Sequence, residues 1–203
     1  MAIVTPVETP PGERRRLRLA SPATRETLYE IEVQNAEDVA QALEGARKAQ
    51  PAWSALSVGE RGRYLLRALD ALVEQQNEFI EVIQRESGKS RSDALRFDVF
   101  PVCDSLAYYA KHGERMLRPE KKRLHGLLRF TKQLRIVHKP LGVVGVISPW
   151  NTPFILSMNP AVQALIAGNT VLLKPSEVAP FSGRLVGDLF EAVGLPEGVL
   201  TVL

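Results

Sequence analysis

Continuous apolar runs mark three strands in the last third of the chain. Residues 143–148 (VVGVIS) and 170–174 (TVLLK) carry few polar side chains, and residues 199–203 (VLTVL) repeat the pattern. Runs of this kind are typical of strands that are buried on both faces in a parallel sheet. The sequence therefore predicts three parallel strands in this region.

Two helices are predicted between these strands. Asn159 and Pro160 suit the cap and the first position of a helix, which continues through AVQALIA to a stop at Gly168. A second helix is expected from about Phe181 to Gly194. Strands and helices then alternate as βαβαβ, which is half of a doubly wound nucleotide-binding sheet.

Before residue 120, apolar residues recur at helical spacing instead. Asn35 and Asp38 fit a capping box at the start of the first helix, and Pro51 is expected to stop that helix. Asn77 is expected to cap a third helix, and Pro101 is expected to kink or break a fourth. The predicted helices cover residues 35–50, 59–75, 77–87, and a stretch from Ser90 or Ser92 to Met116.

The segments on either side of these helices are predicted to be extended. Residues 1–25, rich in Pro, Arg and Thr, are expected to form an extended arm, and a short strand is expected over 28–33. A pair of strands is expected over 122–130 and 132–139, ending at Pro140.

Positive charge is concentrated in residues 111–140, which hold ten Lys or Arg and two Glu, whereas the whole chain has a formal net charge of +3. Such a segment could serve nucleic acid or an anionic surface. In residues 127–137 (LLRFTKQLRIV), however, the charges are interleaved with apolar side chains, as a half-exposed strand requires. A solvated strand is therefore favoured over nucleic-acid binding.

The composition, with 45% hydrophobic and 24% charged residues, fits a globular protein of one large or two small domains. A single cysteine, Cys103, excludes an internal disulfide framework and a zinc site made only of cysteines. Three scattered histidines, His112, His125 and His138, do not favour a metal site. No signal peptide is readable, and no apolar run approaches the roughly 18 residues of a membrane helix. We expect a soluble, cytoplasmic protein without a metal.

Polar groups follow two of the predicted strands, where doubly wound sheets bind their ligands. In residues 148–153 (SPWNTP) two prolines stiffen the turn, and the Asn151 amide offers donors to an oxygen that becomes negative during a reaction. Lys174 and Glu177, after the second strand, suit the hydroxyl groups of a ribose. The structural alternative is a stiff turn with a structural asparagine and a surface Lys–Glu pair.

The glycine fingerprint of ordinary dinucleotide-binding folds, G-x-G-x-x-G, is absent after the first strand. Gly142 and Gly145 precede that strand or lie within it, so they cannot cradle a pyrophosphate at the next helix. A cofactor bound at this sheet must be held in another way.

The segments GVVGVISPWNTPF and AVQALIAGNTVLLKPSE closely resemble the NAD(P)-dependent aldehyde dehydrogenase superfamily. ARKAQPAWSALSVGERGRYLLRALDAL is similar to the early helices of that family, and IQRESGKSRSDA to its acidic Gly-Lys turn. The paired strands at 122–139 resemble its oligomerisation hairpin. The resemblance covers essentially the whole chain and corresponds to the N-terminal portion of the family.

What the resemblance implies for the first turn is an oxyanion donor beside a cofactor. Asn151 matches the asparagine whose amide helps to stabilise a thiohemiacetal oxyanion. Thr152 departs from the aromatic residue usual in the family. The stretch that would lie along the cofactor is Ile147, Ser148, Pro149 and Trp150.

For the second turn, the resemblance implies contacts to the adenosine ribose. Lys174 matches a lysine that hydrogen-bonds the ribose, and Glu177 matches the acid that takes its 2′- and 3′-hydroxyls. Ser176, between them, belongs to the same expected cofactor-binding set. A carboxylate at Glu177 would repel a 2′-phosphate, so NAD is expected, with NADP possible.

The chemistry implied by the resemblance is oxidation of an aldehyde to a carboxylic acid. A cysteine thiolate attacks the carbonyl, hydride passes to the nicotinamide, and water activated by glutamate releases the acid. In the family, the cysteine, the glutamate and a second cofactor-binding turn follow the position of Leu203. Cys103 has no basic residue within the four positions before it and is expected to be a packed residue. We therefore expect the catalytic domain to be absent and the 203-residue chain to be inactive alone.

The alternative is a truncated, non-enzymatic paralogue that acts as a binding or assembly module. The acyl-CoA and phosphate-ester reductases of the same superfamily are further chemistries left open. The expected partners are a small-molecule aldehyde and, in the full-length family, further copies in a dimer or tetramer. Neither nucleic acid nor a membrane is expected.

The expected fold class is α/β: N-terminal helices and an oligomerisation β-hairpin lead into half of a Rossmann-like doubly wound parallel sheet. The expected parts are an extended arm (1–25), a helical part of the cofactor domain (26–120), the hairpin (121–140) and the first βαβαβ half of the NAD(P)-binding domain (141–203).

Overall fold

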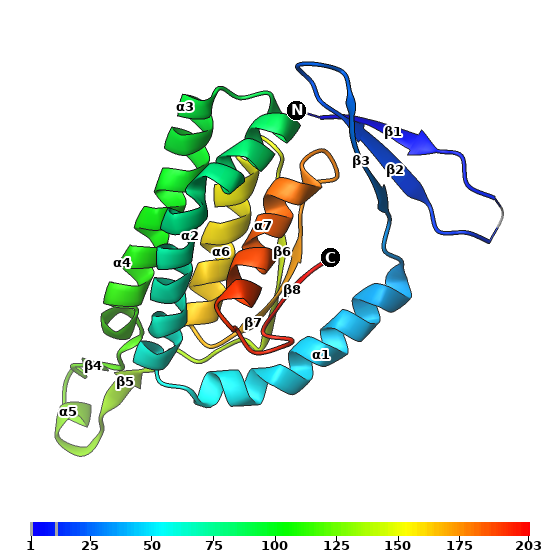
Figure 1. Cartoon of the computed structure of the whole chain (residues 1–203). Helices are drawn as coiled ribbons and strands as arrows, with labels where there is room; N and C mark the ends of the chain where they lie inside the picture. The colour runs from blue at the N-terminus through cyan, green and yellow to red at the C-terminus, as the bar shows by residue number, and fades with distance from the viewer. Residues whose placement is uncertain (1, 11) are drawn as a thin grey trace.

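A three-stranded parallel sheet lies at the centre of the computed structural model, which describes residues 2–10 and 12–203 (Figure 1). Its strands are β6 (Val143–Ile147), β7 (Thr170–Lys174) and β8 (Leu200–Val202), and they are paired in that order. Both pairings are parallel, as predicted from the apolar runs.

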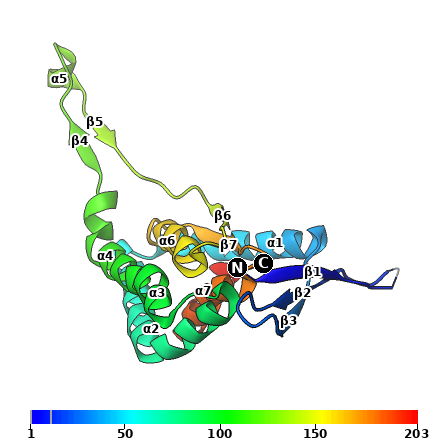
Figure 2. The ribbon, with the colours of Figure 1, turned by 90° about the horizontal axis from the view of Figure 1, so that it is seen from above.

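Helices cover this sheet. α6 (Pro153–Ile166) connects β6 to β7, and α7 (Pro180–Ala192) connects β7 to β8, so the predicted βαβαβ order and the α/β fold class are confirmed. α2 (Val58–Ser87) packs against both connecting helices, and α4 (Phe100–Leu117) packs against α6. α1 (Ala36–Ala55) contacts all three strands (Figures 1 and 2). In the part of the chain that is described, no helix has both the length and the apolar character needed to cross a membrane.

β6 is less buried than its apolar sequence predicts. The first four residues of β7 are fully buried, whereas Gly145 of β6 is exposed and 82% of Ile147 is accessible to solvent. The prediction that residues 143–148 are buried on both faces was wrong. Among the described residues β6 pairs with β7 alone and so forms an edge of the sheet, which leaves part of its surface open.

α6 begins earlier than the sequence predicts. It starts at Pro153 rather than at Asn159–Pro160, and Pro160 lies inside the helix. The Asn159 side chain does not cap a helix; its Oδ1 accepts a hydrogen bond of 2.8 Å from Ser105 Oγ of α4. The predicted stop is confirmed, since Gly168 follows the helix with a φ of +88°.

α1 has the predicted capping box and continues past the predicted stop. Asn35 Oδ1 accepts from the backbone N–H of Asp38, and Asp38 accepts from that of Asn35. Pro51 lies within the helix instead of ending it. The last turn is held by the buried side chain of Trp53, whose Nε1 donates to the carbonyl of Leu165 at 3.0 Å. This tertiary contact offsets the hydrogen bond that proline cannot make.

α2 is one helix where two were predicted. It starts from a Ser57–Glu60 capping box and ends at Gly88, which adopts the left-handed conformation. Asn77 caps nothing; its Oδ1 accepts a hydrogen bond from Arg91. The helix runs through Asn77 because buried apolar residues on both sides of it share one face: Leu65, Ala68, Leu72, Phe79, Ile80 and Ile83.

A wide helical turn replaces the break predicted at Pro101. α3 (Arg91–Ala94), which begins after the predicted cap Ser90, passes through a π-helical turn, η1 (Leu95–Val99), into α4. The backbone N–H of Phe100 donates to the carbonyl of Leu95 across this turn. A π-turn is one way to place proline near the start of a helix without ending it.

The predicted N-terminal arm contains two strands of an antiparallel sheet. β1 (Ile3–Val7) pairs with β2 (Arg16–Ala20), and β2 pairs with β3 (Thr27–Glu32), the strand expected near residue 30. The RLRLA sequence of β2 buries its leucines and exposes its arginines. This alternation is typical of a strand, and the prediction of an extended arm did not take it into account. The predictions for Met1 and Pro11 lie outside the described residues.

A basic hairpin projects from the body of the molecule (Figure 2). Its paired strands, β4 (Glu120–Lys122) and β5 (Leu134–Ile136), are shorter than predicted, and a helical turn, α5 (Leu128–Thr131), lies near the tip. The prediction that the first strand runs over 122–130 was wrong, because β4 ends at Lys122 and α5 occupies the end of that range. All residues from 125 to 141 are exposed, so no buried face stabilises a longer ladder. The domain boundaries proposed above remain predictions.

Candidate functional site

The two polar turns predicted to carry the chemistry lie side by side. β6 and β7 pair in register, with Ile147 opposite Lys174, and the Ser148 backbone N–H donates to the Lys174 carbonyl at 3.1 Å. Residues 147–152 and 174–179 therefore leave the sheet together, and we call them the carboxyl edge. This is the edge at which doubly wound sheets bind ligands.

Three successive residues of the first turn are exposed, and the serine before them is buried. Pro149, Trp150 and Asn151 are exposed, so the Asn151 amide is open to a ligand. Ser148 is 5% exposed, and its Oγ lies 2.7 Å from Ser157 Oγ in α6. The Ser148 side chain therefore links the end of β6 to α6. The residues that follow it in the turn form the surface that a ligand can reach.

The second turn carries the Lys–Glu pair. Lys174 Nζ lies 3.5 Å from Glu177 Oε2 and donates to the Pro175 carbonyl at 3.0 Å. The pKa of Glu177 is lowered, mainly because its carboxylate accepts a hydrogen bond from its own backbone N–H and to a smaller extent because Lys174 is near. Ser176 is buried, and its Oγ accepts from Val178 N–H at 3.4 Å, which makes it a turn-forming residue.

A buried aspartate that the sequence analysis missed caps the helix after the first turn. Asp98 of η1 is fully buried, and its Oδ1 accepts a hydrogen bond from Phe154 N–H at 3.2 Å, in the first turn of α6. Its Oδ2 lies 2.5 Å from Lys89 Nζ. In the sequence, a single acidic residue within the apolar stretch around FDVF could have indicated that Asp98 is buried and has a specific partner.

A second buried acid caps the helix after the second turn. Glu86 Oε1 accepts from Phe181 N–H at 2.9 Å, and Oε2 accepts from the N–H and the Oγ of Ser182, each at 2.6 Å. Glu86 is fully buried in the last turn of α2, where the helix dipole disfavours an acid. An acid at that position of a predicted helix is the signal that could have revealed its role.

These two carboxylates occupy the N-terminal turns of α6 and α7. In many nucleotide-binding sheets such turns bind phosphate through free N–H groups. Here the N–H groups of Phe154, Phe181 and Ser182 already donate to Asp98 or Glu86. An anion would also meet a buried carboxyl group, so the two turns do not suit a phosphate, in agreement with the missing glycine fingerprint.

Glu86 is expected to make stability depend on pH. Burial raises its pKa, against the hydrogen bonds from Ser182 and Phe181. The folded chain then holds a proton that the unfolded chain has lost, so the stability contributed is present at low pH and declines as pH rises through the raised pKa. We expect the free energy of unfolding of the native chain, minus that of Glu86→Gln, to fall as the pH rises above about 4.3, the ordinary pKa of a glutamate. Urea titrations at each pH measure the difference.

The matched control for this prediction is Glu74→Gln, at an exposed position of the same helix. A pH dependence of equal size in both variants would show that it does not arise from the buried site of Glu86. A flat difference for Glu86→Gln would contradict the prediction.

The single cysteine and the three histidines lie in α4 and in the hairpin region, outside the residues that form the carboxyl edge. Cys103 is half-buried in α4, and burial raises the pKa of its thiol, which disfavours the reactive thiolate. His112 packs against the ring of Tyr108, and His125 and His138 are exposed in the hairpin region. Within the described residues, no group of three or more His, Cys, Asp or Glu is placed to hold a metal ion.

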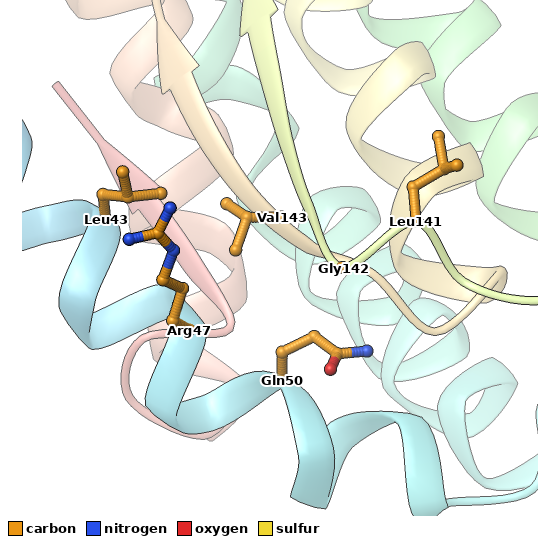
Figure 3. A pocket seen from close by; sticks show the side chains of 6 residues that line it. All are labelled: Leu43, Arg47, Gln50, Leu141, Gly142 and Val143. Carbon is orange, nitrogen blue, oxygen red and sulfur yellow. The ribbon is translucent and has the colours of Figure 1, made fainter.

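A hollow of about 350 Å³ lies at the opposite end of β6 (Figure 3). It is lined by Leu43, Arg47 and Gln50 of α1 and by Leu141, Gly142 and Val143. This hollow lies at the start of β6, whereas the two turns follow the ends of β6 and β7. The hollow is therefore separate from the carboxyl edge.

Comparisons with known proteins agree on one family. Residues 9–203 match the model described as "Aldehyde dehydrogenase family". A 4,4'-diapolycopene aldehyde oxidase from a Methylomonas species is 40% identical over 162 residues, which are 80% of this chain and 31% of that protein. The chain spans about a third of the length of the curated relatives it matches.

Solved structures share the fold. An NAD-dependent benzaldehyde dehydrogenase from Corynebacterium glutamicum is 30% identical with a TM-score of 0.84, over 95% of this chain and 41% of that chain. An NADP-dependent glyceraldehyde-3-phosphate dehydrogenase from Bacillus halodurans C-125, solved with NADP, is also 30% identical with a TM-score of 0.84, over 97% and 41% of the two chains.

Proposed function

The chain belongs to the aldehyde dehydrogenase family, and from this premise we propose that its carboxyl edge forms the adenosine side of an NAD(P) cleft and supplies an oxyanion donor for aldehyde oxidation. The observation that carries the proposal is the adjacency of the two turns, joined by the hydrogen bond from Ser148 N–H to the Lys174 carbonyl. That contact puts the Asn151 turn and the Lys174–Glu177 pair at one edge.

The residues at this edge fit an adenosine. Glu177 is exposed, and its lowered pKa keeps the carboxylate ionised, so it can accept hydrogen bonds from ribose hydroxyls. Lys174 Nζ supplies the complementary donor. The highly exposed side chain of Ile147 offers an apolar surface beside them. When bound, NAD(P) supplies the acceptor for the hydride.

Asn151 is the residue of this chain that acts on the substrate. Its exposed amide can donate to a carbonyl oxygen as that oxygen gains negative charge. The turn that presents it is restrained by Pro149 and Pro153 and by the buried Ser148 contact. A donor held in place before the reaction needs little rearrangement when charge develops.

The proposal also concerns the nucleophile and the general base that aldehyde oxidation requires. Cys103 is the only cysteine of the sequence, and its half-buried thiol with a raised pKa does not suit a nucleophile. We propose that the 203-residue chain does not oxidise aldehydes by itself. We also retain the cytoplasm as the proposed location, because the single cysteine calls for no oxidising compartment.

The proposal is tested with adenosine 5′-monophosphate (AMP) and adenosine 2′-monophosphate as probes. AMP should bind the native chain, and Glu177→Ala should weaken this binding about tenfold, because a hydrogen bond to a charged group contributes roughly 1.5 kcal/mol or more. Adenosine 2′-monophosphate should bind more weakly than AMP, and Glu177→Gln should reduce the difference by removing the repulsion. Ligand-observed NMR titration measures each of these affinities.

The control for the titration is Glu74→Ala, at an exposed position of α2 far from both turns in the sequence. Equal AMP affinity of the native chain and Glu177→Ala would reject the ribose contact. NADH formed by the purified 203-residue chain from NAD and an aldehyde would reject the proposal that it is inactive alone.

A second candidate function, assembly with further copies, is favoured by the basic hairpin. The exposed fraction is 84% for Leu127, 57% for Leu128 and 71% for Phe130, which is unusual for apolar side chains gathered on one projection. We propose that the hairpin binds a second copy of the chain.

Assembly through the hairpin predicts a change of oligomeric state. The native chain should form a dimer or a larger assembly, and Leu127→Asp combined with Phe130→Asp should shift it to the monomer, because a charged pair cannot be buried there. Light scattering after size exclusion measures the mass. Val73→Asp, at a half-exposed apolar position of α2, is the control. An unchanged mass in the hairpin variant would contradict the prediction.

A further inference from the structure

We propose that Asp98 and Glu86 are positioning residues, each of which holds one turn of the carboxyl edge: Asp98 sets the Asn151 turn and Glu86 sets the Glu177 turn. The inference rests on the proposed function for its significance. It goes beyond that function by assigning roles to two buried acids that touch neither the substrate nor the cofactor.

The Asn151 turn is held between two fixed points. On its N-terminal side, Ser148 is bonded to Lys174 of β7 and to Ser157 of α6. On its C-terminal side, the Phe154 N–H donates to the fully buried carboxylate of Asp98. The residue at the N-cap position of α6, Thr152, makes no capping bond with its side chain. The cap of this helix therefore comes from Asp98, and the exposed residues between the two points follow its position.

Asp98 is itself fixed. Its second oxygen pairs with Lys89 Nζ, whose side chain is only 19% exposed. Lys89 follows Gly88, which ends α2 in the left-handed conformation and would place an added Cβ 3.0 Å from Pro22. The end of α2 therefore sets the place of the Lys89–Asp98 pair.

The Glu177 turn is held in the same way from the same end of α2. Ala179, at the N-cap position of α7, likewise makes no side-chain capping bond. Glu86 supplies the cap through its bonds to Phe181 and Ser182. The ring of Phe181 stacks on Tyr29 of β3, with 3.8 Å between the ring centroids. The start of α7 is therefore held by contacts from both α2 and β3.

Two acids only twelve positions apart in the sequence thus restrain the two turns of the carboxyl edge separately. A purely structural role would spread the effect of either substitution over the whole molecule. A positioning role predicts that each substitution moves its own turn, since even a small misplacement of a binding group reduces its contribution strongly. This separation is the basis of the test.

The test compares Asp98→Asn and Glu86→Gln in the isotope-labelled 203-residue chain. Both substitutions keep the size of the side chain and one acceptor oxygen, which favours folding. We expect Asp98→Asn to shift backbone amide signals of residues 150–156, together with the Asn151 side-chain amide, and to change AMP affinity less than about twofold. We expect Glu86→Gln to shift the signals of residues 176–183 and to weaken AMP binding about tenfold.

Each outcome decides the proposal. Changes confined to the matching turn support it. Changes of equal size in both turns for either variant, or no change in either, overturn it. If a variant unfolds, Lys89→Met and Ser182→Ala weaken the same two caps from the donor side and must give the same separation. If the native chain does not bind AMP, the proposed function fails, while the amide signals still decide whether the acids position the turns.

Discussion

Replacing Arg61 with methionine is expected to lower the free energy of unfolding by about 3 kcal/mol, because it leaves several buried carbonyl groups without donors. Arg61 is 5% exposed, and within the described residues it forms no ion pair with a carboxylate. Its Nε donates to the Ile166 carbonyl at 3.0 Å, and its Nη1 donates to the Leu56 carbonyl. One guanidinium therefore satisfies the C-terminal ends of α6 and α1 together.

The measurement is the urea midpoint of the variant, with the slope of the transition checked to be unchanged. Arg63→Met, two positions along the same helix, is the control. Arg63 is largely exposed and makes only a loose ion pair of 3.6 Å with Glu60, so its loss should change stability by less than about 0.5 kcal/mol. If the two variants lose equal stability, the carbonyl contacts of Arg61 contribute little.

Replacing Gly183 with alanine is expected to cost about 2 kcal/mol and to weaken AMP binding as well. An added Cβ at Gly183 would lie 2.5 Å from Pro175 Cβ and 2.8 Å from Pro175 Cγ. The proline ring is tied to the backbone and cannot turn aside, so either the start of α7 or the Lys174–Glu177 turn must shift. Urea unfolding measures the first effect, and the AMP titration measures the second.

Gly45→Ala is the matched control for this substitution. Gly45 lies within α1, and nothing lies within 4 Å of a Cβ added there. Alanine should therefore stabilise the helix by roughly 0.5–1 kcal/mol, because it loses less conformational freedom on folding than glycine does. A Gly183→Ala chain as stable as the native chain would show that the turn tolerates the displacement.

The elements that sequence reasoning predicted correctly are those with local causes. The Asn35–Asp38 capping box and the positive-φ glycines at 168 and 194 involve residues within a few positions of one another. The strand Thr170–Lys174 is a short apolar run whose burial is apparent without knowledge of its neighbours. The motif that includes Asn151, Lys174 and Glu177 could also be found, because the residues follow those strands directly.

The incorrect predictions concern features that depend on contacts between residues distant in the sequence. α6 starts at Pro153 because Asp98 caps it by accepting from Phe154 N–H, 56 positions further along the chain. Helix α1 passes Pro51 because Trp53 bonds to a carbonyl 112 positions away. The roles of Glu86 and Asp98 were missed for the same reason, since the N–H groups that they cap lie 96 and 56 positions further along the chain.

The sequence by itself therefore determined the family, the order of strands and helices in the half-sheet, and the candidate residues of the carboxyl edge. Only the tertiary structure decided where α6 begins, which strand lies at an edge, and which groups hold the two turns. The physical reason is that hydrophobic period and turn chemistry act over a few residues, whereas a buried hydrogen-bond acceptor can come from any part of the chain. The position of Asn151 and Glu177 depends on both kinds of cause, because their turns are encoded locally and their caps come from α2 and η1.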